Sequence, residues 1–190
     1  MVPSKLHLMR EGAILLRIAI LLLALLPTAV LAGTLPPFKL RTLSGQILSW
    51  PADLPDAGAV LILAQDEAQQ AEAATWLPFL ASDVCQRGEA LAYFIVPVLP
   101  EGLLIVRSVV EGAIRRATND PAMLDRTVPL FTDIARLQAS MAIEALNAVQ
   151  VVAVDGGGSV RASASGPYSQ ASAHQLLTAR ADRPGLCASA

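Results

Sequence analysis

The chain has 190 residues, with 14 lysines and arginines, 16 aspartates and glutamates, and two histidines. This charge balance excludes the concentrated basic surface that nucleic-acid binding requires. The histidines are too few for a metal centre built on several imidazoles, and we expect no metal and no cofactor.

The first 32 residues have the features of a secretory signal peptide. A basic start is followed by an uninterrupted apolar run over 18–26, by Pro27, and by modest or small residues at 30–32 that a signal peptidase reads. A membrane span needs about 20 apolar residues, so the short run favours a cleaved signal over a retained anchor. We therefore expect a periplasmic or secreted protein that begins at Gly33 and has no membrane span after cleavage.

The remainder is predicted to be one domain over 33–181, followed by a flexible tail over 182–190. Residues 1–32 hold three basic side chains and one acidic one. Without them the chain keeps 11 basic and 15 acidic residues, a formal charge of about −4. The domain is therefore mildly acidic.

Its first half predicts a hairpin and then a strand and a helix. Residues 38–40 and 47–50 flank a short turn. Residues 59–64 are apolar on both faces, which is typical of a buried central strand. A helix should follow over 66–85, kinked or restarted at Pro78.

Within the helix over 66–85, Trp76 and Leu80 lie on the apolar stripe that should pack against the central strand. The next segments predict a second buried strand and a second helix. The strand covers 91–98, and Pro97 and Pro100 mark the loop after it. A further stripe at helical spacing predicts another helix with an inward apolar face, made of Leu103, Val106, Val110, Ala113, Ile114 and Ala117.

The last part predicts a strand, a helix and a closing hairpin with its helix. The second helix should end at residues 119–121. A short strand over 127–131 precedes a helix that Thr132 or Asp133 caps and that runs to about Met141. Strands over 149–154 and 160–165 then flank a glycine-rich turn, and a helix covers 170–179. The alternation predicts an α/β domain of three layers, a central mixed β-sheet with helices on both faces.

This order resembles the thioredoxin-like fold in its peroxiredoxin-like form, in which a hairpin leads into a β-α-β unit and a β-β-α unit. Short motifs add to the resemblance: Phe38 and Leu40 before Ser44 and Gly45, Pro129 with Asp133, Asp155 with Gly158 and Val160, and Gly166 with Tyr168. Within that fold, the chain is most similar to the thioredoxin-like assembly factors of the mitochondrial F1Fo ATP synthase and their bacterial relatives. The residues that carry this similarity are Gln69, Trp76, Glu111, Gly112, Arg115, Arg116 and 126–129.

The resemblance also shows which chemistry is missing. In redox members the attacking cysteine lies in the loop and first helical turn after the central strand, where the helix N-terminus favours a thiolate. Residues 65–70 occupy that place and contain no sulfur, and Asp66 and Glu67 add negative charge. A cis-proline usually precedes the penultimate strand, yet residues 147–150 include no proline. We therefore expect a non-catalytic protein that acts by protein binding, in assembly or chaperone-like support of an envelope or membrane complex.

Alternatives remain open at this stage. Cys85 and Cys187 either form a structural disulfide or remain two unpaired thiols. The main alternative function is a divergent thiol-disulfide oxidoreductase or peroxidase that uses Cys85. A third is a carrier of a small ligand in the groove beside residues 65–70.

The predicted binding surface is a cluster of three arginines, Arg115, Arg116 and Arg126. Guanidinium groups suit bidentate contact with carboxylates or phosphates. The alternative is a solvated helix end that the helix dipole favours.

Overall fold

A computed structural model describes residues 33–86, 92–118 and 120–178, except for the side chains at 82–86 and 177. These residues belong to one compact unit, Ala32–Ala190. The predicted disulfide and the predicted tail therefore lie outside the described residues, as does the predicted signal peptide.

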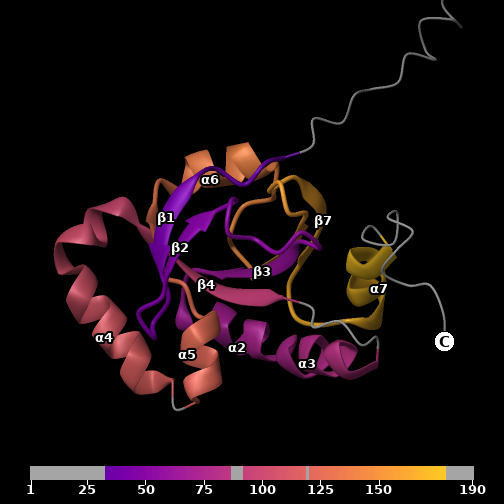
Figure 1. The fold of residues 1–190 in the computed structure, drawn as a ribbon, viewed down its shortest axis with the longest axis horizontal. Coiled ribbons are helices and arrows are strands. Elements are labelled where there is room, and N and C mark those ends of the chain that lie inside the picture. The colour runs from indigo at the N-terminus through magenta and orange to yellow at the C-terminus, as the bar shows by residue number, and fades with distance from the viewer. Residues whose placement is uncertain (1–32, 87–91, 119, 179–190) are drawn as a thin grey trace, which may run out of the picture. The chain divides into compact units, whose positions relative to one another are not determined.

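A five-stranded sheet forms the centre of the domain, with the order β5-β4-β3-β6-β7 (Figure 1). Its strands are β3 (Ala59–Ala64), β4 (Tyr93–Pro100), β5 (Leu130–Thr132), β6 (Gln150–Val154) and β7 (Val160–Ser165). β3, β4 and β5 are parallel, whereas β6 and β7 are antiparallel to their neighbours. The predicted mixed sheet is confirmed.

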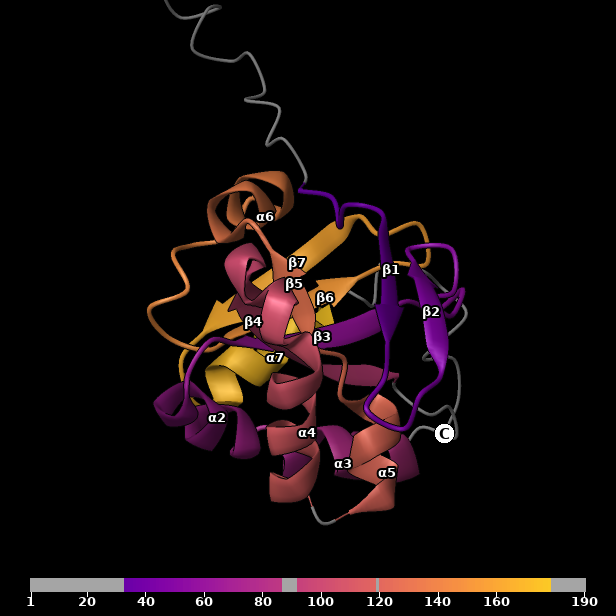
Figure 2. The ribbon, with the colours of Figure 1, turned by 90° about the vertical axis from the view of Figure 1, so that its left-hand side faces the viewer.

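Alternate residues of β3 point to two separate hydrophobic cores, as the strand period requires. Leu61 and Leu63 join one core with the hairpin of β1 (Phe38–Arg41) and β2 (Ile47–Trp50) and with α6 (Ile134–Met141). Figure 2 shows α6 and the hairpin on the same side of the sheet.

Val60 and Ile62 face the other core. This core contains side chains of α2 (Glu67–Ala74), α3 (Leu77–Gln86) and α7 (Gln170–Thr178). Trp76 is 0% exposed and Leu80 is 1% exposed, so the predicted core positions of both side chains are confirmed. The predicted restart of the first helix is also confirmed, because α2 and α3 are separate helices.

Several predicted boundaries are wrong. Pro97 and Pro100 lie inside β4 rather than in a loop, because beyond Pro97 the strand continues by pairing with β5 alone. The helix predicted to end at 119–121 does end close by, at Ala117, but Asp120 also caps a helix that was not predicted, α5 (Pro121–Arg126), with its side chain accepting from the Ala122 N–H. Proline at the first position of a helix loses no hydrogen bond, which explains why a helix starts there.

The second predicted apolar stripe is also wrong in its orientation. Residues 101–117 form a 3-10 helix, η1 (Glu101–Val106), and then α4 (Arg107–Ala117), and neither contains a buried residue. Leu103 and Val106, for example, are 37% and 42% exposed, whereas Val110 and Ile114 are half-buried. The stripe therefore lies at the surface and does not enter the core.

Candidate functional site

The segment that follows β3 occupies the place where redox members of the fold carry their thiol. Asp66 caps α2 and its carboxylate accepts from the Gln69 N–H at 2.9 Å, while Glu67 adds a carboxylate in the first turn. Negative charge here stabilises the helix start through the helix dipole and opposes formation of a thiolate.

Gln69 fills this place with an amide. Its side chain is buried, accepts from the Gln65 N–H at 2.7 Å, and donates to the Leu146 carbonyl at 2.9 Å. One neutral side chain thus joins the β3–α2 loop to the segment that precedes β6. An amide so engaged is neither a nucleophile nor a proton-transfer group.

A second contact from α2 reaches the same segment. The Glu72 carboxylate accepts from the Val149 N–H at 3.1 Å. The stretch compared above with the cis-proline position of redox members is 147–150, and here the peptide groups of Leu146 and Val149 bond to side chains of α2. The Val149 N–H is therefore unavailable to a bound peptide.

The thiol chemistry of the alternative function is only partly visible. Cys85 belongs to α3, far along the chain from the first turn of α2. Its side chain and Cys187 lie outside the described residues, so the disulfide and the role of Cys85 stay predictions.

The three predicted arginines have different surroundings. The Arg115 side chain donates to the Leu43 carbonyl at 2.9 Å, and the Arg126 guanidinium lies 4.3 Å from the centre of the Tyr93 ring. Arg116 is exposed at the last turn of α4. The Leu43 N–H in turn bonds to the Thr127 carbonyl at 2.9 Å, so α4 and the end of α5 meet at the turn of the β1–β2 hairpin. The role of these arginines in binding stays a prediction.

An exposed apolar surface, which the sequence did not reveal as such, lies on η1 and α4. The large hydrophobic side chains that are exposed in the described residues are Ile47, Leu103, Leu104, Ile105, Val106 and Val109. Five of the six belong to η1 and α4, and Ile105 is 94% exposed. We call this set the η1–α4 surface. The signal in the sequence was the apolar run over 103–106, of which the predicted stripe included only Leu103 and Val106.

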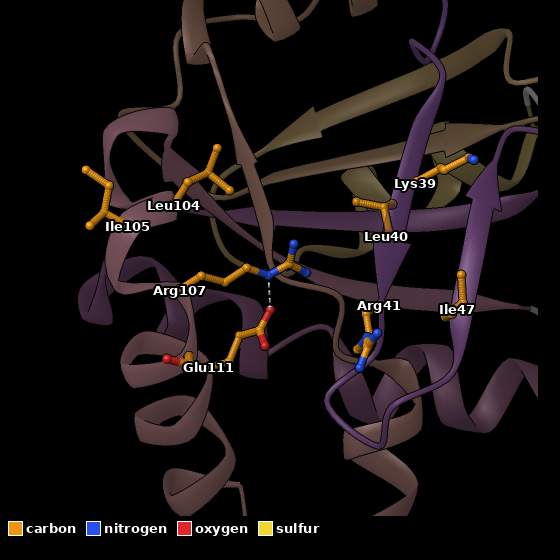
Figure 3. A pocket seen from close by; sticks show the side chains of 9 residues that line it. Lys39, Leu40, Arg41, Ile47, Leu104, Ile105, Arg107 and Glu111 are labelled. Carbon is orange, nitrogen blue, oxygen red and sulfur yellow. Dashed lines mark hydrogen bonds and ion pairs between the residues drawn. The ribbon is translucent and has the colours of Figure 1, made fainter.

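A pocket of about 550 Å³ separates η1 and the start of α4 from the β1–β2 hairpin (Figure 3). Leu104 and Ile105 line it on one side, and Leu40 and Ile47 line it on the other. The sixth exposed hydrophobic side chain, Ile47, therefore lies across the pocket from the others. Apolar side chains therefore lie on both walls of the pocket.

The charged groups of the pocket are mostly basic. Lys39, Arg41 and Arg107 contribute three cations and Glu111 one carboxylate. Arg107 extends from the start of α4 toward β1, and its Nε donates to Glu111 at 2.6 Å (Figure 3). In the part of the chain that the structure describes, Lys39 and Arg41 have no ion-pair partner. A basic pocket thus lies on a domain that is acidic as a whole.

No group of three side chains suited to hold a metal ion occurs among the described residues. No helix within that same part is long and apolar enough to cross a membrane.

Comparisons with known proteins are informative about the fold. No protein-family model matches the chain, and no curated protein matches it. An uncharacterized conserved protein from Geobacillus kaustophilus is 12% identical, with 85% of this chain and 88% of that one covered and a TM-score of 0.55. A putative electron transfer protein from Aquifex aeolicus VF5 is also 12% identical, with coverage of 82% and 96% and a TM-score of 0.53. A thio-disulfide isomerase from Thermus thermophilus is 20% identical, with coverage of 78% and 95% and a TM-score of 0.46.

The domain has a thioredoxin-like fold. Its β3-α-β4 unit, antiparallel β6–β7 pair and closing helix α7 have the order that the sequence predicted. At these identities the similarity concerns the arrangement of the chain and says nothing about catalysis.

Proposed function

We propose that this protein is a non-catalytic thioredoxin-like domain of the periplasm or cell exterior that acts by binding another protein. The role would be assembly or chaperone-like support of an envelope complex, as the resemblance to the ATP synthase assembly factors implies. The first 32 residues support the location, because they have the features of a secretory signal.

The observation that carries the proposal is the exposure of the η1–α4 surface. A soluble monomer rarely exposes a contiguous group of large apolar side chains unless that group is a contact site. Here η1 and α4 present five of them, next to a pocket with polar and charged walls. An apolar centre with a polar rim is the usual composition of a protein-binding surface.

The filled thiol position supports the non-catalytic part of the proposal. Gln69 and Glu72 engage the segment before β6 in hydrogen bonds, and residues 65–70 contain no sulfur. The rival is a thiol enzyme that uses Cys85. Insulin reduction and peroxide turnover by the purified protein distinguish the two, because turnover that disappears in Cys85→Ser would establish the rival.

The binding role is tested by site-specific photo-crosslinking in cells. A photoreactive amino acid at Ile105 should crosslink to a distinct protein. The matched control is the exposed position Ala171 on α7, which lies on the opposite side of the domain from α4 (Figures 1 and 2). Equal patterns from both positions, or no adduct from Ile105, would contradict the proposal.

A further inference from the structure

The β1–β2 hairpin has one protected edge and one open edge. The register pairs Lys39 with Ser49 and Arg41 with Ile47, and the next pair is joined by a bond from the Thr42 N–H to the Gln46 carbonyl. Hydrogen-bonded and non-hydrogen-bonded pairs alternate in antiparallel sheets. The peptide groups of Lys39 and Arg41 therefore point away from β2.

The outer edge of β2 is protected at Ser49. Asp53 caps it, because its carboxylate accepts from the Ser49 N–H and its own N–H donates to the Ser49 carbonyl at 2.8 Å. This contact also confirms the register, since the peptide groups of Ser49 must point away from β1. Its partner across the hairpin, Lys39, has no such cap: among the described residues, neither Lys39 nor Arg41 has a hydrogen-bond partner for these outward groups.

The open edge of β1 faces the basic pocket. β1 lies between β2 and α4 in both views of the domain (Figures 1 and 2), and Lys39, Leu40 and Arg41 line the pocket together with Leu104 and Arg107. Unpaired strand edges accept another strand, and the added strand contributes backbone hydrogen bonds while its side chains provide specificity. The site therefore combines a free backbone ladder, an apolar wall and an excess of positive charge.

We propose that β1 binds an extended segment of a partner protein as an added β-strand, and that this segment alternates acidic and apolar side chains. Its carboxylates would lie beside Lys39 and Arg41, and its apolar side chains would pack toward Leu40 and Leu104. The inference rests on the proposed function, because the basic pocket beside β1 is lined by Leu104 and Ile105 of the η1–α4 surface. It adds the backbone mode of recognition and the chemistry of the partner.

The charges argue against a second copy of this chain as the occupant. If two β1 edges paired with each other, the side chains of Lys39 and Arg41 would face like charges, which destabilises a strand pair. The same two cations oppose nonspecific edge pairing, a common protection of exposed strands. An acidic strand turns this repulsion into attraction.

The first experiment identifies a peptide and tests its chemistry. A phage-displayed library of random dodecapeptides is selected on the mature protein, and the tightest peptide is synthesised with a fluorescent label. We expect acidic and apolar residues to alternate in the selected sequences. Basic or patternless sequences, or no selected peptide at all, would contradict the proposal.

The second experiment tests the backbone contacts without changing the protein. Each peptide N–H of the selected peptide is methylated in turn. Because only every second residue of an added strand bonds to the neighbouring edge, affinity should fall with a period of two. A single loss of about tenfold corresponds to one hydrogen bond. A flat profile would overturn strand addition.

The third experiment tests β1 itself. Lys39→Pro removes an N–H that makes no bond to β2, and proline is tolerated at such edge positions. It should weaken the peptide more than Lys39→Ala, which removes the same charge but keeps the N–H. Denaturation midpoints verify that both variants fold; if Lys39→Pro does not fold, the methylation scan decides alone. Equal effects of the two variants would contradict strand addition.

The outcomes separate this inference from the proposed function. A specific crosslink from Ile105 together with a flat methylation profile would remove strand addition and leave protein binding intact. Loss of the Ile105 crosslink would remove the proposed function itself. A dimer in sedimentation that the selected peptide disrupts would identify a second copy as the occupant and overturn the proposal.

Discussion

Gln69 makes two contacts in the segment that follows β3. Its amide accepts from the Gln65 N–H and donates to the Leu146 carbonyl, and its side chain is buried. An amide is suited to this role because it offers a donor and an acceptor without charge. The residue thus fixes the β3–α2 loop to the segment before β6.

Truncating this side chain should destabilise the domain. Gln69→Ala leaves the half-buried Gln65 N–H and the buried Leu146 carbonyl without these partners, and we expect the free energy of unfolding to fall by about 1–3 kcal/mol. The matched control is Gln70→Ala, an exposed neighbour, which should change it by less than about 0.5 kcal/mol. Urea denaturation measures both, and equal effects would show that the contacts of Gln69 are not structural.

Two neighbouring arginines provide a second test at this scale. Both are exposed at the end of α4, but the Arg115 side chain donates to the carbonyl of Leu43, a residue 2% exposed. Arg115→Ala should therefore lower the free energy of unfolding by about 1 kcal/mol, and Arg116→Ala by less than about 0.5 kcal/mol. If both variants keep wild-type stability, Arg115 does not support the hairpin turn.

At the scale of the element, the sequence predicted best the features that a local pattern decides. β3 and β7 were predicted to the residue, because apolar or alternating runs bounded by turn residues leave little choice of ends. The cap of α6 by Asp133 was one of two predicted caps, and its carboxylate accepts from the Arg136 N–H at 3.1 Å. Local chemistry decides such features.

Features that depend on the surroundings were not predictable in the same way. The spacing of apolar residues over 103–117 predicts one face of a helix, but it carries no information on whether the domain itself covers that face. The candidate site was missed because it consists mainly of side chains outside that stripe, Leu104, Ile105 and Val109, and of a pocket between distant segments. The start of α5 was missed as well, although Asp120 followed by Pro121 is a typical helix start.

The turn between β6 and β7 yields a prediction on pH. Partial burial raises the pKa of the Asp155 carboxyl, but hydrogen bonds from the Ser159 N–H and Arg161, with the charge of Arg161, outweigh this effect and hold the pKa below its ordinary value. A carboxyl whose pKa is lower in the folded than in the unfolded state stabilises the fold at every pH above its unfolded pKa of 3.8. This stabilisation is lost as the pH falls from 3.8 through the lower pKa of the folded state.

Asp155→Asn should therefore destabilise the domain at neutral pH, by about 1–2 kcal/mol through weakened charge-assisted hydrogen bonds. The difference from wild type should shrink as the pH falls below 3.8, because the wild-type carboxyl is then neutral as well. Denaturation midpoints between neutral and acidic pH measure this, with the exposed Asp125→Asn as control. A difference that does not depend on pH would contradict the assignment.

At the scale of the whole molecule, the predicted start of the mature chain is compatible with the packing of Gly33. The Val160 N–H donates to its carbonyl at 2.7 Å, and a side chain on this residue would begin 1.9 Å from the Met141 carbonyl oxygen. The domain therefore needs glycine at this position and includes it in its structure. Cleavage before Gly33 would leave the described domain complete at that end.

The intact mass of the protein purified from the cell envelope tests this start. We expect the mass of residues 33–190. A mass that includes residues 1–32 would identify a retained anchor instead, and the location of the protein would then be a membrane surface.

The central claim is that this thioredoxin-like domain acts by binding a protein through the η1–α4 surface and without thiol chemistry. The most direct test compares the partner recovered after in-cell crosslinking for the wild type, Cys85→Ser, and Ile105→Asp combined with Val109→Asp. Both substituted side chains of the double variant are exposed, so its stability should stay within about 1 kcal/mol of the wild type. We expect undiminished recovery with Cys85→Ser and a loss of at least about tenfold, or 1.4 kcal/mol, with the double variant; loss with Cys85→Ser and full recovery with the double variant would contradict the account.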